Sequence, residues 1–444
     1  MSWQSSELRA IGRLAGPAIL TQAGTMLMGV VDTLMVSRVG TEVLAAAAIA
    51  NVWSSLTLFC STGLLLGMDP LVSQAHGAGY GRRAGIVLQQ GVVVALALTL
   101  PVAGLFLLTE PGLVLLGQKP ELAAAAHAYL WVQLPSIPCL LVFTALRQYL
   151  QGRTLVRPAM WLMIVANGLN ALANWALIFG NLGLPALGLV GAGIATSLVR
   201  VFLVLGLWIW VVRARLHAGA WVPWSRRALD PAGLRRLLSL GLPVALQLVL
   251  EIGAFSGSTL LAGLLSVSEL GAHTIALNLA SLSFMLPLGI AIAASTRAGN
   301  LLGAGQPERV RRSARVAFGL GAGIMLISAG AFIFLPKQLA RLYTSDPEVV
   351  SFCVLILPIA GAFQIFDGTQ VVACGVLRGV GRTRPAAWAG FVGYWLFGLP
   401  LGAWLAFSAG AGVSGIWTGL AIGLAGVAVA LLLRVLFGRL DAQR

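Results

Sequence analysis

Twelve long apolar segments constrain the fold of this chain more than any other feature of its sequence. Each is long enough for a membrane-spanning helix, which needs about 20 apolar residues. Of the 444 residues only 10% are charged, whereas soluble domains carry about 25%. We therefore predict an all-α integral membrane protein and exclude soluble enzymes, disordered chains and coiled coils. The expected spans are residues 14–37, 44–68, 86–108, 123–146, 158–179, 186–212, 238–264, 270–295, 314–335, 349–376, 386–407 and 413–437.

The basic residues are distributed unevenly among the loops. If alternate connections face one side, that side receives all but five of the 29 lysines and arginines. Arg38, Lys119, Lys337 and Arg341 fall on the other side, and Arg200 lies inside a span. Basic residues collect on the cytoplasmic side of membrane proteins, so we predict that both termini are cytoplasmic. The net charge of +15 then indicates contact with anionic membrane lipids, and we expect no nucleic-acid partner.

The two halves of the sequence repeat each other. Gly16-Pro17 aligns with Leu242-Pro243, and Gly77-Ala78-Gly79 aligns with Gly303-Ala304-Gly305, at a shift of 226 residues in each case (242 minus 16, 303 minus 77). Each half carries six spans, an even number, so both halves keep one orientation, as in transporters with parallel repeats. The predicted fold is two parallel six-helix repeats.

We expect this repeat to divide the chain into two lobes and a linker. Residues 1–212 form the predicted N-terminal lobe, residues 213–237 a cytoplasmic linker, and residues 238–444 the C-terminal lobe. Within the linker, Asp230 and Pro231 are typical of a helix N-cap followed by a first-turn proline. They predict a short surface helix.

Ionisable side chains inside the spans indicate function, because a charge is costly to bury in a membrane. Asp32, Glu251 and Asp367 are the carboxylates that lie well inside predicted spans. Asp32 shares one helix face with Thr21 and Thr25. Asp69, near the cytoplasmic end of the second span, is expected in a solvated role.

The acidic positions differ between the halves. Glu251 shares a face with Gln247 and Ser258, and the repeat aligns Glu251 with Thr25 and Ser258 with Asp32. Asp32 and Glu251 therefore occupy positions seven residues apart in the aligned repeats, which corresponds to about 10 Å of depth along a helix. The halves are similar in plan and different in chemistry.

Other polar residues accompany these acids. Asp367 shares a face with Phe363, Gln370 and Cys374. The fifth span presents Asn167, Asn170 and Asn174, whose amides could coordinate a cation, accept a proton donor or simply hydrogen-bond between helices. Arg200 could pair with an acid or extend to the interface; the sequence leaves both alternatives open.

The chain resembles the multidrug and toxic compound extrusion (MATE) family, NorM-type branch. The resemblance rests on the duplicated twelve-helix plan, on GMDPLVSQAHGAG at 67–79, on STRAGNLLGAG at 295–305, and on Glu251 and Asp367. It covers essentially the whole chain. It implies a multidrug antiporter that exports organic cations in exchange for inward protons or sodium by alternating access, without a cofactor.

The resemblance also implies which residues carry the coupling ion. Glu251 and Asp367 match the second-lobe acids that bind cations and substrate. Asp32 matches the first-lobe protonatable acid, and Asn170 and Asn174 match its polar neighbours.

The expected substrate contacts surround the second-lobe acids. Phe255 falls where the family can stack substrate, one turn from Glu251, and Gln247 lies on the same face. Phe363 stands where some sodium-coupled relatives have tyrosine, so a hydroxyl is absent. This departure favours protons as the coupling ion without excluding sodium.

Physical chemistry is consistent with exchange of a proton for an organic cation. Burial away from water favours the protonated form of a carboxylic acid, whereas a cation over an aromatic ring gains about 0.5–2 kcal/mol and favours the ionised acid. Proton and drug would compete for one negative charge. We expect small organic cations and membrane lipids as partners, a monomer, and a bacterial inner membrane as the location.

Two other classes of membrane protein agree less well with this sequence. A flippase for lipid-linked oligosaccharides would need a basic cavity, but the ionisable residues in these spans are mainly acidic. An integral membrane enzyme would need clustered catalytic groups or metal ligands, and no such spacing occurs in the sequence. Both are less well supported than an antiporter.

Overall fold

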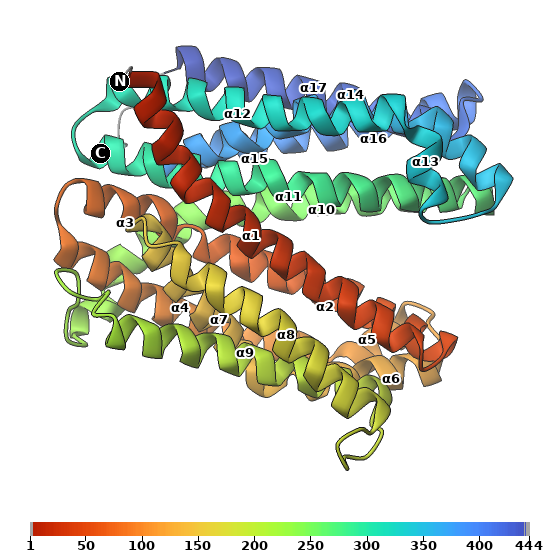
Figure 1. The fold of residues 1–444 in the computed structure, drawn as a ribbon, viewed down its shortest axis with the longest axis horizontal. Coiled ribbons are helices and arrows are strands. Elements are labelled where there is room, and N and C mark those ends of the chain that lie inside the picture. The colour runs from red at the N-terminus through yellow and green to blue at the C-terminus, as the bar shows by residue number, and fades with distance from the viewer. Residues whose placement is uncertain (1–2, 439, 441–444) are drawn as a thin grey trace. The chain divides into compact units, whose positions relative to one another are not determined.

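The computed structural model describes residues 3–438 and 440, and every regular element in that range is helical (Figure 1). Twelve segments are long and apolar enough to cross a membrane, so the predicted all-α fold with twelve spans is confirmed. The elements are α1 (Trp3–Ser37), α2 (Thr41–Leu65), α3 (Met68–Gly77), α4 (Gly81–Leu107), α5 (Thr109–Leu115), α6 (Pro120–Trp131), η1 (Leu134–Ser136), α7 (Ile137–Gly152), α8 (Arg157–Phe179), α9 (Gly188–Arg213), η2 (Arg226–Leu229), α10 (Pro231–Gly263), α11 (Val267–Gly303), α12 (Pro307–Phe334), α13 (Pro336–Arg341), α14 (Pro347–Gly379), α15 (Arg384–Gly390), η3 (Phe391–Gly398), α16 (Leu399–Ala403), η4 (Trp404–Ser408) and α17 (Gly412–Phe437).

Proline explains where two of the spans change helix type. The fourth span passes through the 3₁₀ turn η1, which contains Pro135, before α7 begins. The eleventh span is π-helical in η3 and η4 on either side of α16, which contains Pro400. Proline has no N–H to donate and its ring collides with the preceding turn, so the regular hydrogen-bond ladder is interrupted there.

The predicted short helix at Asp230 is wrong in its length. Asp230 does cap the helix, because its Oδ2 accepts a hydrogen bond from the Gly233 N–H at 3.1 Å. The helix continues, however, as the single element α10 to Gly263. Leu237 in its second turn is completely buried, so packing extends the helix through the expected linker.

The Gly-Ala-Gly motifs form the same turn in both halves. Gly79 follows α3 with φ of 76°, and Gly305 follows α11 with φ of 72°. The residue after each glycine donates its N–H to the carbonyl five positions earlier, at 2.8 and 2.9 Å. This is a Schellman-type helix end, which favours glycine because its φ is positive. The repeat detected in the sequence is therefore a repeat in the backbone.

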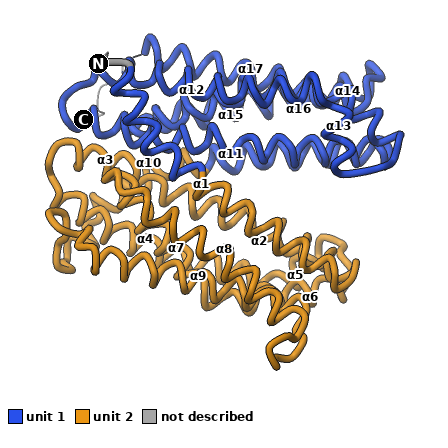
Figure 2. Tube along the Cα trace, viewed as in Figure 1, with its two compact units in different colours: residues 1–19, 246–444 blue, residues 20–245 orange. Residues whose placement is uncertain are grey.

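The chain forms two compact units. Unit 1 comprises residues 1–19 and 246–444, and unit 2 comprises residues 20–245 (Figure 2). Both dividing points lie inside long helices, α1 and α10, a few residues beyond Pro17 and Pro243. The lobes proposed from the sequence, 1–212 and 238–444, stay a prediction, and their residues 1–2, 439 and 441–444 lie outside the described range.

Within unit 1, α14 is the central helix. It packs against α11, α12 and α17 (Figure 1). Gly379 brings α14 close to α11, because a Cβ at this position would lie 2.1 Å from the carbonyl oxygen of Ser295. Asp367 is therefore carried on the most enclosed helix of unit 1.

Within unit 2, α7 packs on α3, α4 and α9, and α8 packs on α9 (Figure 1). The buried core includes Tyr149, Leu141 and Phe106. The polar face of α8 is the part of this unit in which the sequence predicted chemistry.

Candidate functional site

In unit 2, Asp32 meets the asparagines of α8. The Asn174 side-chain amide donates a hydrogen bond to Asp32 Oδ1 and a second one to Asn170 Oδ1 at 3.3 Å. Both asparagines are fully buried. The structure thus brings together three of the residues expected to carry the coupling ion.

This polar cluster keeps unused hydrogen-bonding capacity. Asn170 Nδ2, Asn174 Oδ1 and Asn167 Oδ1 are buried and have no hydrogen-bond partner among the described residues. Buried polar atoms are normally paired, because leaving one unpaired costs about 1–3 kcal/mol. The cluster can therefore accept a further donor or a cation in addition to the interhelical hydrogen bond.

Arg200 lies beside this cluster. Its Nη1 donates to Ser136 Oγ at 3.1 Å, and its charge interacts electrostatically with Asp32 and Tyr129. In the described part of the chain Arg200 forms no salt bridge within 4 Å. It therefore supplies positive charge near Asp32 without direct pairing.

In unit 1, Glu251 on α10 and Asp367 on α14 interact electrostatically. Asp367 is 5% exposed and Glu251 is half-buried. Gln247 and Gln370 lie within hydrogen-bonding reach of Glu251. Across residues 3–438 and 440, neither acid has a basic partner at salt-bridge distance. Unit 1 thus presents two neighbouring carboxyl groups with neutral amides beside Glu251.

A thiol and a phenol complete the polar part of this site. Gln247 Nε2 donates to Cys374 Sγ at 3.2 Å. Tyr394 Oη donates to Gln370 Oε1 at 3.4 Å and interacts electrostatically with both acids. These contacts hold the glutamines in fixed positions around Glu251.

Aromatic rings line the neighbouring part of unit 1. Phe255 contacts the ring of Phe363 at 6.1 Å between centroids and that of Tyr394 at 6.3 Å. Phe363 packs in turn on Trp417 at 5.9 Å. Phe363 is buried and Phe255 is half-buried, so Phe255 is the more accessible of these two rings.

Sequence reasoning missed two residues of this region, Tyr394 and Trp417. Both are almost completely buried, and Trp417 Nε1 has no partner among the described residues. A tyrosine hydroxyl inside the eleventh span was the available signal for Tyr394. Trp417 carried no comparable signal, because most tryptophans in membrane proteins lie at interfaces.

The predicted solvated role of Asp69 is wrong. Asp69 in α3 is completely buried, accepts a hydrogen bond from Gln151 Nε2 at 3.2 Å and interacts with the charge of Arg147. Gly152 explains the burial, because a Cβ there would lie 2.8 Å from Val72. The close approach of α3 and α7 leaves no room for water around the carboxylate.

Comparison with known proteins identifies the family. The MatE family model matches residues 17–176 and 243–404, and so occurs once in each half of the chain. The chain belongs to the MatE family. The match begins at Pro17 and Pro243, the two prolines that the repeat aligns. Together with relatives named NorM, it confirms the predicted resemblance to the MATE family, NorM-type branch. This chain is a multi-pass membrane transporter.

The relatives of this MATE transporter match it along nearly its whole length. A probable multidrug resistance protein NorM of Pseudomonas putida is 38% identical over 437 residues, which cover 96% of this chain and 94% of the relative. Multidrug resistance protein PmpM of Pseudomonas aeruginosa is 35% identical and covers 97% and 91%. The crystal structure of the eukaryotic MATE transporter AtDTX14 superposes with a TM-score of 0.91 at 25% identity, covering 99% and 98%.

Proposed function

We propose that this MATE transporter is a multidrug efflux antiporter that exports organic cations in exchange for inward protons. Its relatives are named multidrug resistance proteins, which supports the export of drugs. The residues of the two acidic clusters support protons as the coupling ion and organic cations as the substrates. We place it as a monomer in the cell inner membrane, with both termini in the cytoplasm, as the arginine distribution favours.

The observation that carries this proposal is the unpaired acidic pair of unit 1. Glu251 and Asp367 interact with each other and have no basic partner in the described chain. Two carboxylates without a counter-ion attract a proton or a cation, because burial and mutual repulsion disfavour two negative charges. We therefore assign both acids to substrate and proton binding.

The surrounding residues fit an organic cation. Phe255 offers a half-buried ring beside Tyr394 and Phe363, and a cation over such a face gains about 0.5–2 kcal/mol. Gln247 supplies a neutral amide near Glu251. These residues recognise charge and apolar surface, which many drugs share, and not one particular shape.

The cluster of unit 2 is assigned to the coupling ion. Asp32 with Asn170 and Asn174 binds a proton, or a small cation through the unpaired amide oxygen of Asn174. Arg200 nearby adds positive charge, which opposes the binding of an organic cation in this unit. We therefore place drug binding in unit 1.

Drug export is coupled to proton entry because the two cations compete for the acidic pair of unit 1. Each proton that moves inward contributes about 2.3 kcal/mol per 100 mV of membrane potential. If proton and drug cannot share the acidic pair, protonation releases the drug, and alternating access turns that exchange into export.

The direct test replaces the acids by amides of equal size. Glu251→Gln and Asp367→Asn remove the charge and keep the volume, so each is expected to reduce export of a fluorescent organic cation from proteoliposomes at least tenfold. Glu348→Gln is the matched control, because Glu348 is an exposed acid on the same helix as Asp367. It should export at the rate of the unaltered protein. If both single variants export normally after correct insertion, the acids have no part in transport.

A further inference from the structure

A basic cavity of 720 Å³ opens in unit 2, and its lining includes none of the acids assigned to transport. Its lining comes from α3, α4, η2 and the first turns of α10. Arg83, Arg226, Arg227 and Arg236 all contribute to this lining. Export of cations gives these four residues no role.

Positive charges outnumber negative charges on the lining of this cavity. Asp230 is the one carboxylate on its lining, and its Oδ2 is engaged with the Gly233 N–H at the start of α10. Over the described residues, none of the four arginines forms a salt bridge. The cavity therefore presents a surplus of guanidinium groups, which favour phosphate ligands.

The wall that carries two of these arginines is held in place. Gln89 Nε2 donates to the carbonyl oxygens of Val222 and Pro223 at 2.8 and 3.0 Å. Gln90 Nε2 donates to the carbonyl of Arg227 at 3.2 Å. Both glutamines lie on α4 and are buried. These hydrogen bonds hold the segment after α9 against α4, so the backbone that carries Arg226 and Arg227 is fixed in position.

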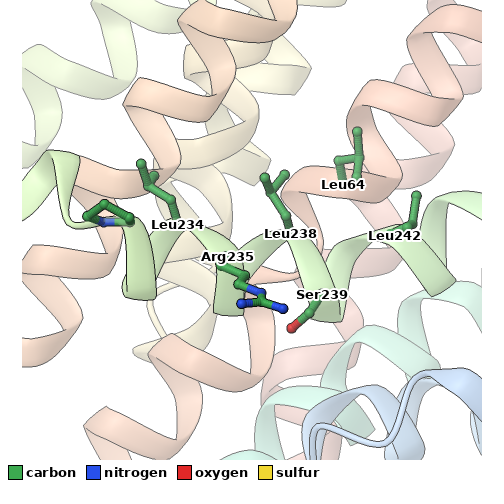
Figure 3. A pocket seen from close by; sticks show the side chains of 7 residues that line it. Leu64, Leu234, Arg235, Leu238, Ser239 and Leu242 are labelled. Carbon is green, nitrogen blue, oxygen red and sulfur yellow. The ribbon is translucent and has the colours of Figure 1, made fainter.

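An apolar groove of 620 Å³ continues from the cavity along α10. Pro231 lines both spaces. Leu234 and Leu238 extend to the side of α10 that faces Leu64, whereas Arg235 points to the other side (Figure 3). The basic cavity thus continues into the apolar groove, which is lined by leucines.

The surface beside the cavity has the composition of a membrane interface. Trp221 and Trp224 are exposed on the segment that forms its wall. Tryptophan is enriched where membrane meets water. The arginine distribution places this end on the cytoplasmic side, where the leaflet is rich in anionic lipids.

From this arrangement we propose that the cavity and the groove together bind one anionic phospholipid. The phosphate lies among Arg83, Arg226, Arg227 and Arg236, and one acyl chain lies along Leu234 and Leu238. A free phosphate or a nucleotide would use the basic cavity and leave the leucine groove unused, so a phospholipid fits both halves of the site.

The test measures lipid binding to the purified full-length protein by native mass spectrometry in detergent. Phosphatidylglycerol is expected to bind at least tenfold more tightly than phosphatidylcholine, and at least tenfold more tightly than glycerophosphoglycerol, which has the headgroup without acyl chains. Equal binding of the two lipids would overturn the role of the arginines. Equal binding of glycerophosphoglycerol and phosphatidylglycerol would overturn the role of the groove and leave only an anion site.

Variants locate the site. Arg226→Gln with Arg227→Gln should weaken phosphatidylglycerol binding at least tenfold. Arg213→Gln with Arg215→Gln should not, because these arginines lie at the end of α9 and just after it, outside the cavity. Leu238→Gln should reduce the advantage of phosphatidylglycerol over its chain-free headgroup. If the two arginine pairs behave alike, the lipid binds elsewhere. The lipid comparisons on the unaltered protein remain decisive should a variant fail to fold, and none of them depends on transport.

Discussion

At the scale of single residues, the two halves use different side chains for one backbone turn. After α7, Thr154 has φ of 65°, and after α14, Gly381 has φ of 79°. The residue after each donates its N–H to the carbonyl five positions earlier, at 2.8 Å in both halves. A β-branched residue is strained in this left-handed conformation, by about 1–2 kcal/mol. The first half therefore carries a strain that glycine avoids in the second.

Exchanging these residues should change stability in opposite directions. Thr154 is exposed, so Thr154→Gly loses little packing and should raise the unfolding free energy by about 0.5–1 kcal/mol, after the entropy cost of glycine. Gly381→Thr should lower it by about 1–2 kcal/mol. The melting temperature, followed by tryptophan fluorescence in detergent, measures both. Thr154→Ala retains a Cβ, so a gain equal to that of Thr154→Gly would show that backbone strain is not the cause.

At the scale of elements, an ion pair between buried Glu7 and half-buried Arg297 holds the start of α1 within unit 1. Arg297 on α11 donates from Nε to Glu7 Oε2 at 3.0 Å and from Nη2 to Oε1. Ser313 on α12 donates to Glu7 Oε2 at 3.2 Å. Glu7 was overlooked in the sequence because the first span was expected to begin at residue 14. The helix begins earlier, and its first turns join α11 and α12.

Removing one partner of this pair should loosen the start of α1. Glu7→Gln leaves half-buried Arg297 without a counter-ion, and this should cost about 1–3 kcal/mol, less than breaking a fully buried pair. Hydrogen exchange of the amides between residues 5 and 19 should then accelerate at least about tenfold. Glu308→Gln, an exposed acid at the start of α12, is the control. Unchanged exchange in Glu7→Gln would show that packing alone holds this segment.

At the scale of the whole molecule, the acids are divided unequally between the units. Unit 2 carries Asp32 among asparagines and near Arg200, whereas unit 1 carries Glu251 with Asp367 among glutamines and aromatic rings. A duplicated backbone thus supports two different binding chemistries. In the proposed mechanism this asymmetry lets the drug compete with protons in unit 1, whereas unit 2 binds the coupling ion without the drug.

The coupling ion can be determined on the whole protein. A pH gradient in sodium-free buffer should drive transport of a fluorescent cation into proteoliposomes, because the carboxylates accept protons and Phe363 offers no hydroxyl for sodium. A sodium gradient at uniform pH should drive less than about a tenth of that rate, as a tenfold preference needs only about 1.4 kcal/mol. Vesicles without protein provide the baseline. Transport at full rate under the sodium gradient would contradict proton coupling.

The sequence by itself determined the membrane class, the twelve spans, the duplication and the family, because long apolar runs and repeated turn motifs are local signals that no distant contact can reverse. Only the tertiary structure decided which polar groups face one another. It buried Asp69, joined Glu7 to Arg297, added Tyr394 to the acidic site, and extended α10 through the expected linker. Such pairings depend on how closely helices distant in sequence pack, and hydropathy along the chain contains no measure of that distance.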